Sequence, residues 1–483
     1  MKRRRFVWGL GIGLLACGAP GAPVAAQQPD LRARVESVGA IPIDFEQPEV
    51  LRWDVGGVPV LALPDPALPL LTVHAYLRGG YGRFDRSHYA AASGLPALLR
   101  YGGTQTRTPS EVDEAIEGLA LQLSFGSAGG SVTSTLNTLA ENADAALELW
   151  GDMMANPGFD GVEIEAWRGR QLESVLRRVD DPARLAFSET NRLLYGDHPV
   201  GWEMEPADLE PARVSVERFD EVHARVFCRD NLTLGVTGSL DRSEIEPLLE
   251  TLVQQLPLCS RPLPRAPDPS IRRAPGVFVV DRPLAQSVIV MAHATNVRLA
   301  DAPRYYAAMV GNSVLGGGGF SSRILSRVRT EEGFAYSATS LWTTPARHEG
   351  IIAATTRTRP ERTADAIDVM LGTMQELTEE PPTADEVQRT IDQFVSGFVF
   401  SFDSPGQVVA RQMFYLAQGL PEDWLNRFWA GVQQVRPDDV LDVFHAEVDP
   451  SRMSIVVVGD AALIEDKLAR FGPVQRIEIE GGR

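Results

Sequence analysis

The chain has 483 residues, of which 44% are hydrophobic and 23% charged, and its formal net charge is −18. This length suggests about two to four domains, and the apolar content excludes a disordered tail. The acidic balance disfavours nucleic-acid binding, which needs a basic surface. Three cysteines are too few for a disulfide scaffold or a cysteine-rich zinc module.

Residues 1–26 have the pattern of an export signal peptide. Four basic residues at positions 2–5 precede a short apolar segment at 6–16, and the small residues at 24–26 suit cleavage before Gln27. The apolar segment is shorter than the roughly 20 residues that span a bilayer, which disfavours a membrane anchor.

Two other export routes are open. Leu14-Leu15-Ala16-Cys17 fits a lipoprotein signal that would lipidate Cys17, and residues 3–7 resemble a twin-arginine signal. All three routes end outside the cytoplasm. The sequence therefore predicts an exported, periplasmic protein, whose attachment to a membrane would depend on a lipid at Cys17.

A proline-rich segment divides the remaining chain into two similar halves. Residues 261–275 contain five prolines and no apolar periodicity, which is typical of an extended linker. Matching apolar strands end at Gly238 and Gly459, 221 residues apart, and each lies between two helical stretches. This repeat predicts two homologous domains, at residues 40–260 and 276–480.

The apolar periodicity predicts strands, helices and a hairpin within both halves. Thr108-Pro109-Ser110-Glu111 is a capping box that should open a helix. Because hairpins accompany the helices, we expect an α+β (mixed α/β) fold in which each domain has a mixed, mostly antiparallel sheet packed against helices. In chain order, the strands are expected at 70–79, 231–238, 287–294 and 452–460, the hairpin at 121–136, and helices at 111–120, 142–154, 161–178, 215–227, 243–256, 438–448 and 461–471.

Cys228 and Cys259 each lie next to the end of a predicted element. They could form a disulfide in an oxidising compartment. Two separate thiols are the alternative, because the sequence does not place the two Cα atoms within bonding range.

Local motifs for catalysis are missing from the chain. The closest two histidines, His74 and His88, are fourteen residues apart, so neither H-E-x-x-H nor H-x-x-E-H occurs. No G-x-S-x-G nucleophile elbow precedes a helix, and neither Cys228 nor Cys259 has a thiol-enzyme signature. The seven histidines are His74, His88, His198, His223, His293, His348 and His445.

The most informative segment is VLGGGGFSSRILSRVRTEEGFAYS, at residues 314–337. A helix should start around Phe320, with Ser321 or Ser322 as its cap, and should end at Gly333 before a strand at 334–340. A phosphate-binding loop is disfavoured because no Gly-Lys-Ser/Thr follows the glycines. A mobile loop is the other alternative for the four glycines, Gly316, Gly317, Gly318 and Gly319. We expect the helix after them to bury Ile324, Leu325 and Val328.

This segment resembles the C-terminal-domain motif of the pitrilysin-like (insulinase-type) zinc peptidases, which include mitochondrial processing peptidase. The family's arginine and tyrosine, seven residues apart, fall on Arg329 and Tyr336. The stretches GTQTRTPSEV (103–112) and YGDHPVGW (195–202) also look like this family. The resemblance implies two homologous domains that enclose a chamber.

The catalytic motif departs from the family pattern. Active members carry G-L-x-H-x-x-E-H-x-x-x-x-G-T. Alignment on the final Gly-Thr places the zinc histidines at Gly94 and Leu98 and the general-base glutamate at Ala97. Alignment on the opening Gly-Leu instead places the histidines at Ala97 and Tyr101 and the glutamate at Arg100. Both registers lack every histidine ligand and the general base.

The third zinc ligand of active relatives is a glutamate further along the chain, and Glu173 lies at about that distance. A single carboxylate on a helix is usually a solvated surface group. We therefore expect neither zinc nor another cofactor in this chain, and zinc in a partner subunit.

One branch of the family divides its active site between two subunits, and this chain resembles the subunit without zinc. The resemblance implies a homologous partner that carries H-x-x-E-H, with unstructured peptides as substrates. Arg329 would hold a substrate carbonyl, Tyr336 would donate to the oxyanion, and Gly316–Gly319 would guide the peptide.

Three alternatives compete with this interpretation. Arg329 could pair with Glu331 or Glu332 while Tyr336 fills a core, in which case neither residue has a functional role. The chain could be a structural or peptide-binding scaffold of an envelope complex without peptidase activity. It could also be an independent peptidase that uses another site.

Overall fold

The computed structural model describes residues 48–267, 271, 274–399, 402 and 404–479. The predicted signal peptide, including Cys17, lies outside these residues. In the part of the chain that the structure describes, no helix has the length and apolar character needed to cross a membrane.

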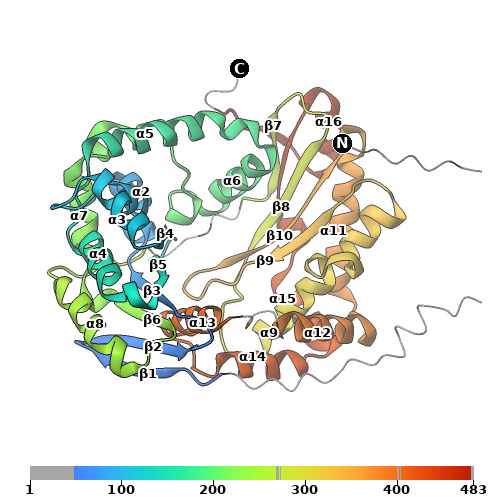
Figure 1. Ribbon diagram of the computed structural model, residues 1–483. Coiled ribbons are helices and arrows are strands. Elements are labelled where there is room, and N and C mark those ends of the chain that lie inside the picture. Colours follow the sequence, from blue (N-terminus) through green and yellow to red (C-terminus); the bar gives the residue numbers. More distant parts are fainter. Residues whose placement is uncertain (1–47, 268–270, 272–273, 400–401, 403, 480–483) are drawn as a thin grey trace, which may run out of the picture. The chain divides into compact units, whose positions relative to one another are not determined.

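Two six-stranded sheets organise the structure, and each is built from one half of the chain (Figure 1). In both sheets one inner pair of strands is parallel, β2 with β6 and β7 with β11, and β12 also pairs in parallel with β7, while the other pairings are antiparallel. The predicted fold class is confirmed. The first sheet has the order β1 (Leu51–Val55), β2 (Val58–Pro64), β6 (Leu232–Gly238), β3 (Leu70–Arg78), β5 (Ser131–Leu139), β4 (Gln122–Ser127). The second has the order β12 (Val474–Arg476), β7 (Gly276–Asp281), β11 (Ser454–Gly459), β8 (Ser287–Thr295), β10 (Gly350–Thr358), β9 (Ala338–Trp342).

The predicted helices and the hairpin β4–β5 are confirmed, with small shifts at their ends. The capping box between Thr108 and Glu111 forms as expected and opens α3. The helices of the first half are α2 (Tyr89–Tyr101), α3 (Pro109–Gly118), α4 (Ala143–Ala155), α5 (Gly161–Leu176), α6 (Pro182–Tyr195), α7 (Val216–Val226) and α8 (Arg242–Gln255). Those of the second are α9 (Pro303–Asn312), α10 (Arg323–Leu325), α11 (Thr363–Glu379), α12 (Ala384–Val399), α13 (Pro405–Gln418), α14 (Trp424–Gln433), α15 (Pro437–Glu447) and α16 (Ala461–Leu468).

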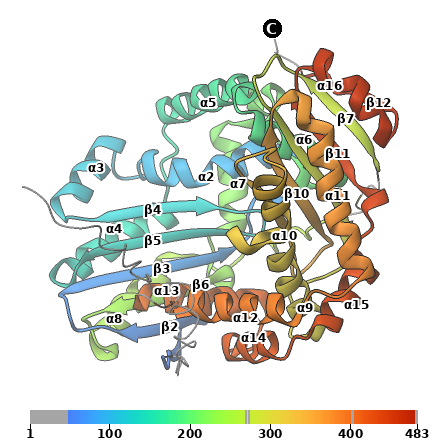
Figure 2. The ribbon, with the colours of Figure 1, turned by 90° about the vertical axis from the view of Figure 1, so that its right-hand side faces the viewer.

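The two sheets bury their faces differently. Strand β3 alternates, so that Leu71, Val73, Ala75 and Leu77 enter the first core while the intervening side chains stay half-buried. Strand β8 is buried at almost every position, which means that both faces of the second sheet are covered. Helix α11 covers one of these faces, where it contacts β8 and β10 (Figure 2).

Each half supplies one helix to the sheet of the other half. Helix α6 contacts β8 and β11 of the second sheet, where Leu185 joins the apolar cluster of Val288 and Val456. Helix α13 contacts β2 and β6 of the first sheet, where Val409 and Met413 pack on Leu61.

Both exchanged helices begin with the same local signal, a capping side chain before a proline at the first helical position. These pairs are Asp181-Pro182 and Ser404-Pro405. The described residues of the segment 261–275 contain no helix or strand.

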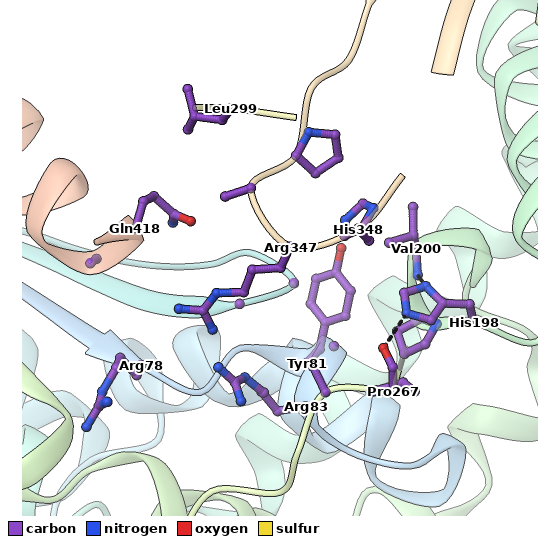
Figure 3. Close-up of a pocket in the computed structure, with 18 of the residues that line it drawn as sticks. Arg78, Tyr81, Arg83, His198, Val200, Pro267, Leu299, Arg347, His348 and Gln418 are labelled. Carbon is purple, nitrogen blue, oxygen red and sulfur yellow. Dashed lines mark hydrogen bonds between the residues drawn. The ribbon is translucent and has the colours of Figure 1, made fainter. Parts of the chain in front are cut away.

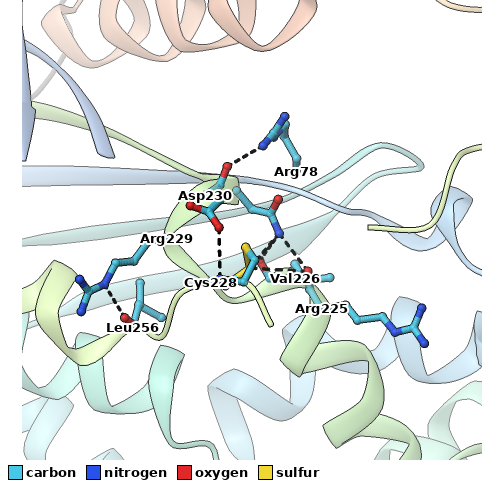
Figure 4. Close-up of a disulfide and its surroundings, with 9 residues drawn as sticks. Arg78, Arg225, Val226, Cys228, Arg229, Asp230 and Leu256 are labelled. Atoms are coloured by element: carbon cyan, nitrogen blue, oxygen red, sulfur yellow. Dashed lines mark hydrogen bonds between the residues drawn. A yellow bond between two sulfur atoms is a disulfide. The ribbon is translucent and has the colours of Figure 1, made fainter. Parts of the chain in front are cut away.

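A disulfide joins Cys228, just after α7, to Cys259, just after α8, with Cα atoms 5.0 Å apart (Figure 4). Asp230 lies between these ends. Its carboxylate accepts a hydrogen bond from the backbone N–H of Cys259 (3.2 Å), and its backbone carbonyl accepts one from the guanidinium of Arg78 (2.5 Å). The disulfide therefore sits beside a residue that orients an arginine at the end of β3.

Candidate functional site

The glycine run is partly helical, which corrects the expectation of a loop over Gly316–Gly319. Helix α9 continues as a wider π turn through Ser313–Gly317. Gly316 is buried, and a Cβ there would lie 2.5 Å from the backbone nitrogen of Ser340 on β9. Only Gly319 has a positive φ, of 71°. Gly316 therefore serves close packing against β9, and the exposed turn is confined to the glycines after it.

The expected helix begins at Arg323, with Ser322 as its N-cap residue, and continues as a π turn through Ser326–Glu331. Ile324 and Val328 are buried as predicted, whereas Leu325 is only half-buried.

The strand that follows starts later than predicted, at Ala338. Threonines of β10 account for the later start of the strand. Their hydroxyls donate hydrogen bonds to backbone carbonyls of residues before Ala338, which would otherwise accept from the backbone of a neighbouring strand. Thr358 donates to the carbonyl of Phe334 and Thr356 to that of Ser337, both at 2.7 Å.

Two arginines of this motif are held by ion pairs with neighbouring helices. Arg323 makes a two-pronged contact with Glu386 of α12, at 2.7 and 2.8 Å, and Arg327 makes one with Glu376 of α11, at 2.8 and 2.6 Å. The hydrogen bonds from Arg323 lower the pKa of Glu386 to about 2. These pairs fix the motif helix on α11 and α12.

Arg329 is placed differently from these two arginines. Its guanidinium carbon lies 4.6 Å from the ring centre of Tyr336 and 5.1 Å from that of Phe320, and both aromatic side chains are 80% exposed. Among the described residues it makes no ion pair or hydrogen bond. The interpretation of Arg329 as the partner of Glu331 or Glu332, with Tyr336 in a core, is therefore wrong. The half-buried guanidinium of Arg329 and the exposed rings of Tyr336 and Phe320 instead form one surface cluster.

Phe320 was missed as a member of this surface. Its position after the four glycines predicts the start of a helix and carries no signal that the ring is exposed. Its exposed ring has no core to fill, and the contact with Arg329 is what positions it.

The positions that correspond to the family's zinc ligands do not fit a metal ion. Gly94 and Leu98 are buried in α2, and a Cβ on Gly94 would lie 2.6 Å from the ring of Trp167 on α5. That indole, itself 4% exposed, fills the space beside the helix with apolar atoms. In this register no oxygen, nitrogen or sulfur atom of a side chain is available to bind zinc.

The second register gives no better donor set. Arg100 pairs with Asp113 at 2.7 Å, and its guanidinium lies over the ring of Tyr101. Glu173 is exposed on α5 and pairs with Arg177, also at 2.7 Å, as a surface carboxylate does. Over the described residues, no group of three or more His, Cys, Asp and Glu side chains could hold a metal ion.

Comparisons with known proteins agree with this combination of fold and motif. Residues 213–394 match the family described as the peptidase M16 inactive domain. An uncharacterized zinc protease of Streptomyces coelicolor is 22% identical over 401 residues, which cover 79% of this chain and 85% of that protein. The non-peptidase homolog YmxG of Helicobacter pylori is 22% identical over 280 residues, which cover 58% and 64% of the two chains.

Solved structures show the same fold. A peptidase M16 inactive domain from Pseudomonas fluorescens superposes with a TM-score of 0.76 at 22% identity and covers 85% of this chain and 98% of its own. The periplasmic protease PqqL of Escherichia coli gives a TM-score of 0.72 at 12% identity, over 92% of this chain and 49% of that one.

The two-sheet fold and the arginine–tyrosine motif of this chain are similar to those of the M16 peptidases, and the described residues at the positions of that family's zinc ligands offer no metal-binding set. Residues 213–394 match the inactive-domain model of that family, which agrees with the resemblance that the motif predicted.

Proposed function

We propose that this chain is the zinc-less subunit of a heteromeric M16 peptidase. In this proposal Arg329 and Tyr336 bind a peptide and stabilise the transition state at the zinc site of a homologous partner that carries H-x-x-E-H. The single observation that carries the proposal is the contrast within one motif. Arg323 and Arg327 are held by carboxylates, while the half-buried Arg329 contacts two exposed rings and no carboxylate of the described residues.

The chemistry of these side chains suits an extended peptide. A guanidinium presents five N–H donors in a fixed fork and can hold a backbone carbonyl, and the phenol of Tyr336 can donate to an oxyanion. The ring of Phe320 adds an apolar contact beside them. Zinc in the partner would supply the Lewis acid and the activated water of such a site.

The proposal also includes an exported location for this chain. The disulfide between Cys228 and Cys259 supports it, because such bonds persist in oxidising compartments. PqqL of Escherichia coli, which has a similar fold, is a periplasmic protease. We place this chain in the periplasm, where a lipid at Cys17 is the alternative to a free mature protein.

The test is to isolate the tagged chain with its partner from the native envelope and assay the pair on unstructured peptides. Arg329→Ala and Tyr336→Phe should each lower kcat by about 10²–10³-fold, as does removal of one oxyanion donor. Arg389→Ala is the matched control, because this exposed arginine on α12 donates to a backbone carbonyl of its own helix. It should leave turnover unchanged.

Unchanged hydrolysis by a pair that bears both substitutions would overturn the role of Arg329 and Tyr336. Stoichiometric zinc in the isolated chain, or hydrolysis by that chain alone, would overturn the zinc-less assignment. A stable complex that binds peptides at Arg329 without cleaving them would instead establish the scaffold function.

A further inference from the structure

A cavity of about 670 Å³ lies where several loops meet (Figure 3), and its described lining includes no residue of the arginine–tyrosine motif. Its walls come from the end of β3 and the turn after it, the β4–β5 turn, the segment after α6, residues 265–267, the β9–β10 loop and the end of α13. Both halves of the chain thus contribute to it. The volume falls within the roughly 300–1,000 Å³ of ligand pockets.

One side of the cavity carries concentrated positive charge. Arg78, Arg83 and Arg347 gather there (Figure 3), and Arg265 also lines the cavity. None of the described lining residues is Asp or Glu, although the whole chain has a net charge of −18. Such a local reversal of sign gives the cavity a positive potential, which favours an anionic ligand.

Carboxylates within the described part of the chain do not compensate these three arginines. Arg78 and Arg83 donate only to the backbone carbonyls of Asp230 (2.5 Å) and Pro264 (3.4 Å), and Arg347 makes no ion pair or hydrogen bond to the described residues. Burial, together with the like charges of Arg347 and Arg78, lowers the pKa of Arg83. An anion in the cavity would relieve this repulsion.

The opposite side is aromatic and apolar. Tyr81, Val200, His198 and His348 lie there (Figure 3). His198 donates from Nε2 to the carbonyl of Pro267 (3.1 Å) and accepts at Nδ1 from the N–H of Val200 (3.2 Å), so both ring nitrogens are used. Burial lowers the pKa of His198, with a further contribution from His348, which favours the neutral ring.

From this two-sided wall we propose that the cavity binds a short acidic peptide segment. Its carboxylates pair with Arg78, Arg83 and Arg347, for which guanidinium–carboxylate geometry is well suited. Its apolar side chains contact the wall formed by Tyr81 and Val200. A small inorganic anion would leave that wall without contacts, and a basic peptide would be repelled. The site needs neither the partner subunit nor zinc, so it goes beyond the proposed function.

The probe is a fluorescein-labelled pentapeptide, Glu-Leu-Glu-Leu-Glu with blocked ends, and its counterpart with glutamine in place of each glutamate. Binding to the mature chain is followed by fluorescence anisotropy at two salt concentrations. The acidic peptide should bind and the glutamine peptide should bind at least about tenfold more weakly, because charge-assisted hydrogen bonds are the stronger ones. Salt should weaken the acidic peptide selectively.

Arg347→Gln is the main variant because the residue lies on the β9–β10 loop and supports no other contact among the described residues. It should raise the Kd of the acidic peptide about tenfold while thermal unfolding stays unchanged. Arg83→Gln should add to this effect. Arg168→Gln on α5 is the matched control, because that arginine pairs with Glu165 of the same helix, and it should not alter Kd.

Equal affinity for the two peptides, or an unchanged Kd in Arg347→Gln, would overturn the proposal. So would saturable binding of inorganic pyrophosphate without any binding of the peptide. Because the assay uses the isolated chain, its failure leaves the partner-dependent function standing, and the absence of a partner leaves this site standing.

Discussion

His223 shows how a single buried side chain ties stability to pH. It is 9% exposed, donates from Nε2 to the carbonyl of Met154 (2.7 Å), and stacks on Phe227 with ring centres 5.1 Å apart. Burial lowers the pKa of His223 below its ordinary value of 6.5. Below pH 6.5 the unfolded chain therefore binds a proton that the folded chain resists.

We expect the free energy of unfolding to be fully retained above about pH 6.5 and to fall as the pH drops below it, by up to about 1.4 kcal/mol per pH unit for this group. His223→Gln keeps a donor for Met154 and should flatten this slope. The measurement is urea unfolding between pH 7.5 and 5. The exposed His445→Gln is the control and should keep the wild-type slope, whereas an equally steep slope in His223→Gln would contradict the argument.

At the residue scale, the sequence could single out Arg329 and Tyr336 as candidate site residues because their motif is contiguous, and their role stays a prediction. It could not predict that Arg329 stays unpaired, since Glu331 and Glu332 lie as near in sequence as the two rings. The arginines of the cavity were missed because Arg83 and Arg347 come from different halves and each stands alone in its loop. No local sequence pattern indicates that these arginines lie close together in the folded chain.

At the element scale, the motif helix depends on a carboxylate outside itself. Glu386 receives both hydrogen bonds from Arg323, and its pKa of about 2 lies below the ordinary 4.5. Its contribution is therefore fully present above pH 4.5 and is lost as the pH falls through about 2.

Glu386→Gln should lower the free energy of unfolding at pH 7 by about 1.5–3 kcal/mol, the range for hydrogen bonds to charged groups. The difference from wild type should shrink near pH 2.5. Urea titrations at both values check this, and the exposed Glu380→Gln at the end of α11 serves as the control. A destabilisation of equal size at both pH values would show that the ion pair is not its cause.

Apolar periodicity located most strands and helices, since each buries one face in a core. It did not reveal the π turns at Ser313–Gly317 and Ser326–Glu331, whose residues look like ordinary helix. It also could not assign α6 to the second sheet, because an apolar helix face does not specify which sheet covers it. Contacts between the two halves depend on the tertiary structure, and the apolar pattern of one helix does not encode them.

At the scale of the whole molecule, the exchange of α6 and α13 couples the two sheets. Leu185 on α6 and Leu98 on α2 are both buried leucines of the first half, but they pack in different clusters. Leu98 belongs to the first core, whereas Leu185 packs on strands of the second sheet. Truncation of Leu98 should therefore destabilise the first sheet, and truncation of Leu185 should destabilise the second.

Leu185→Ala should cost about 2–5 kcal/mol, as buried leucine truncations do. Its signature is faster amide hydrogen exchange in β8 and β11, although the substituted residue belongs to the other half. Leu98→Ala is the matched control and should speed exchange in the first sheet instead. Faster exchange confined to the first sheet in Leu185→Ala would contradict the coupling.

The exchanged helices α6 and α13 also determine at what stage of synthesis the molecule can finish folding. A ribosome makes α6 long before it makes β8, and β11, the other strand that contacts α6, follows later still. Until then α6 of the nascent first half has no sheet to pack on. The first sheet likewise lacks α13, which packs on β2 and β6. Folding of the two sheets is therefore complete only after β11 has been made, and the growing chain needs protection from aggregation until then.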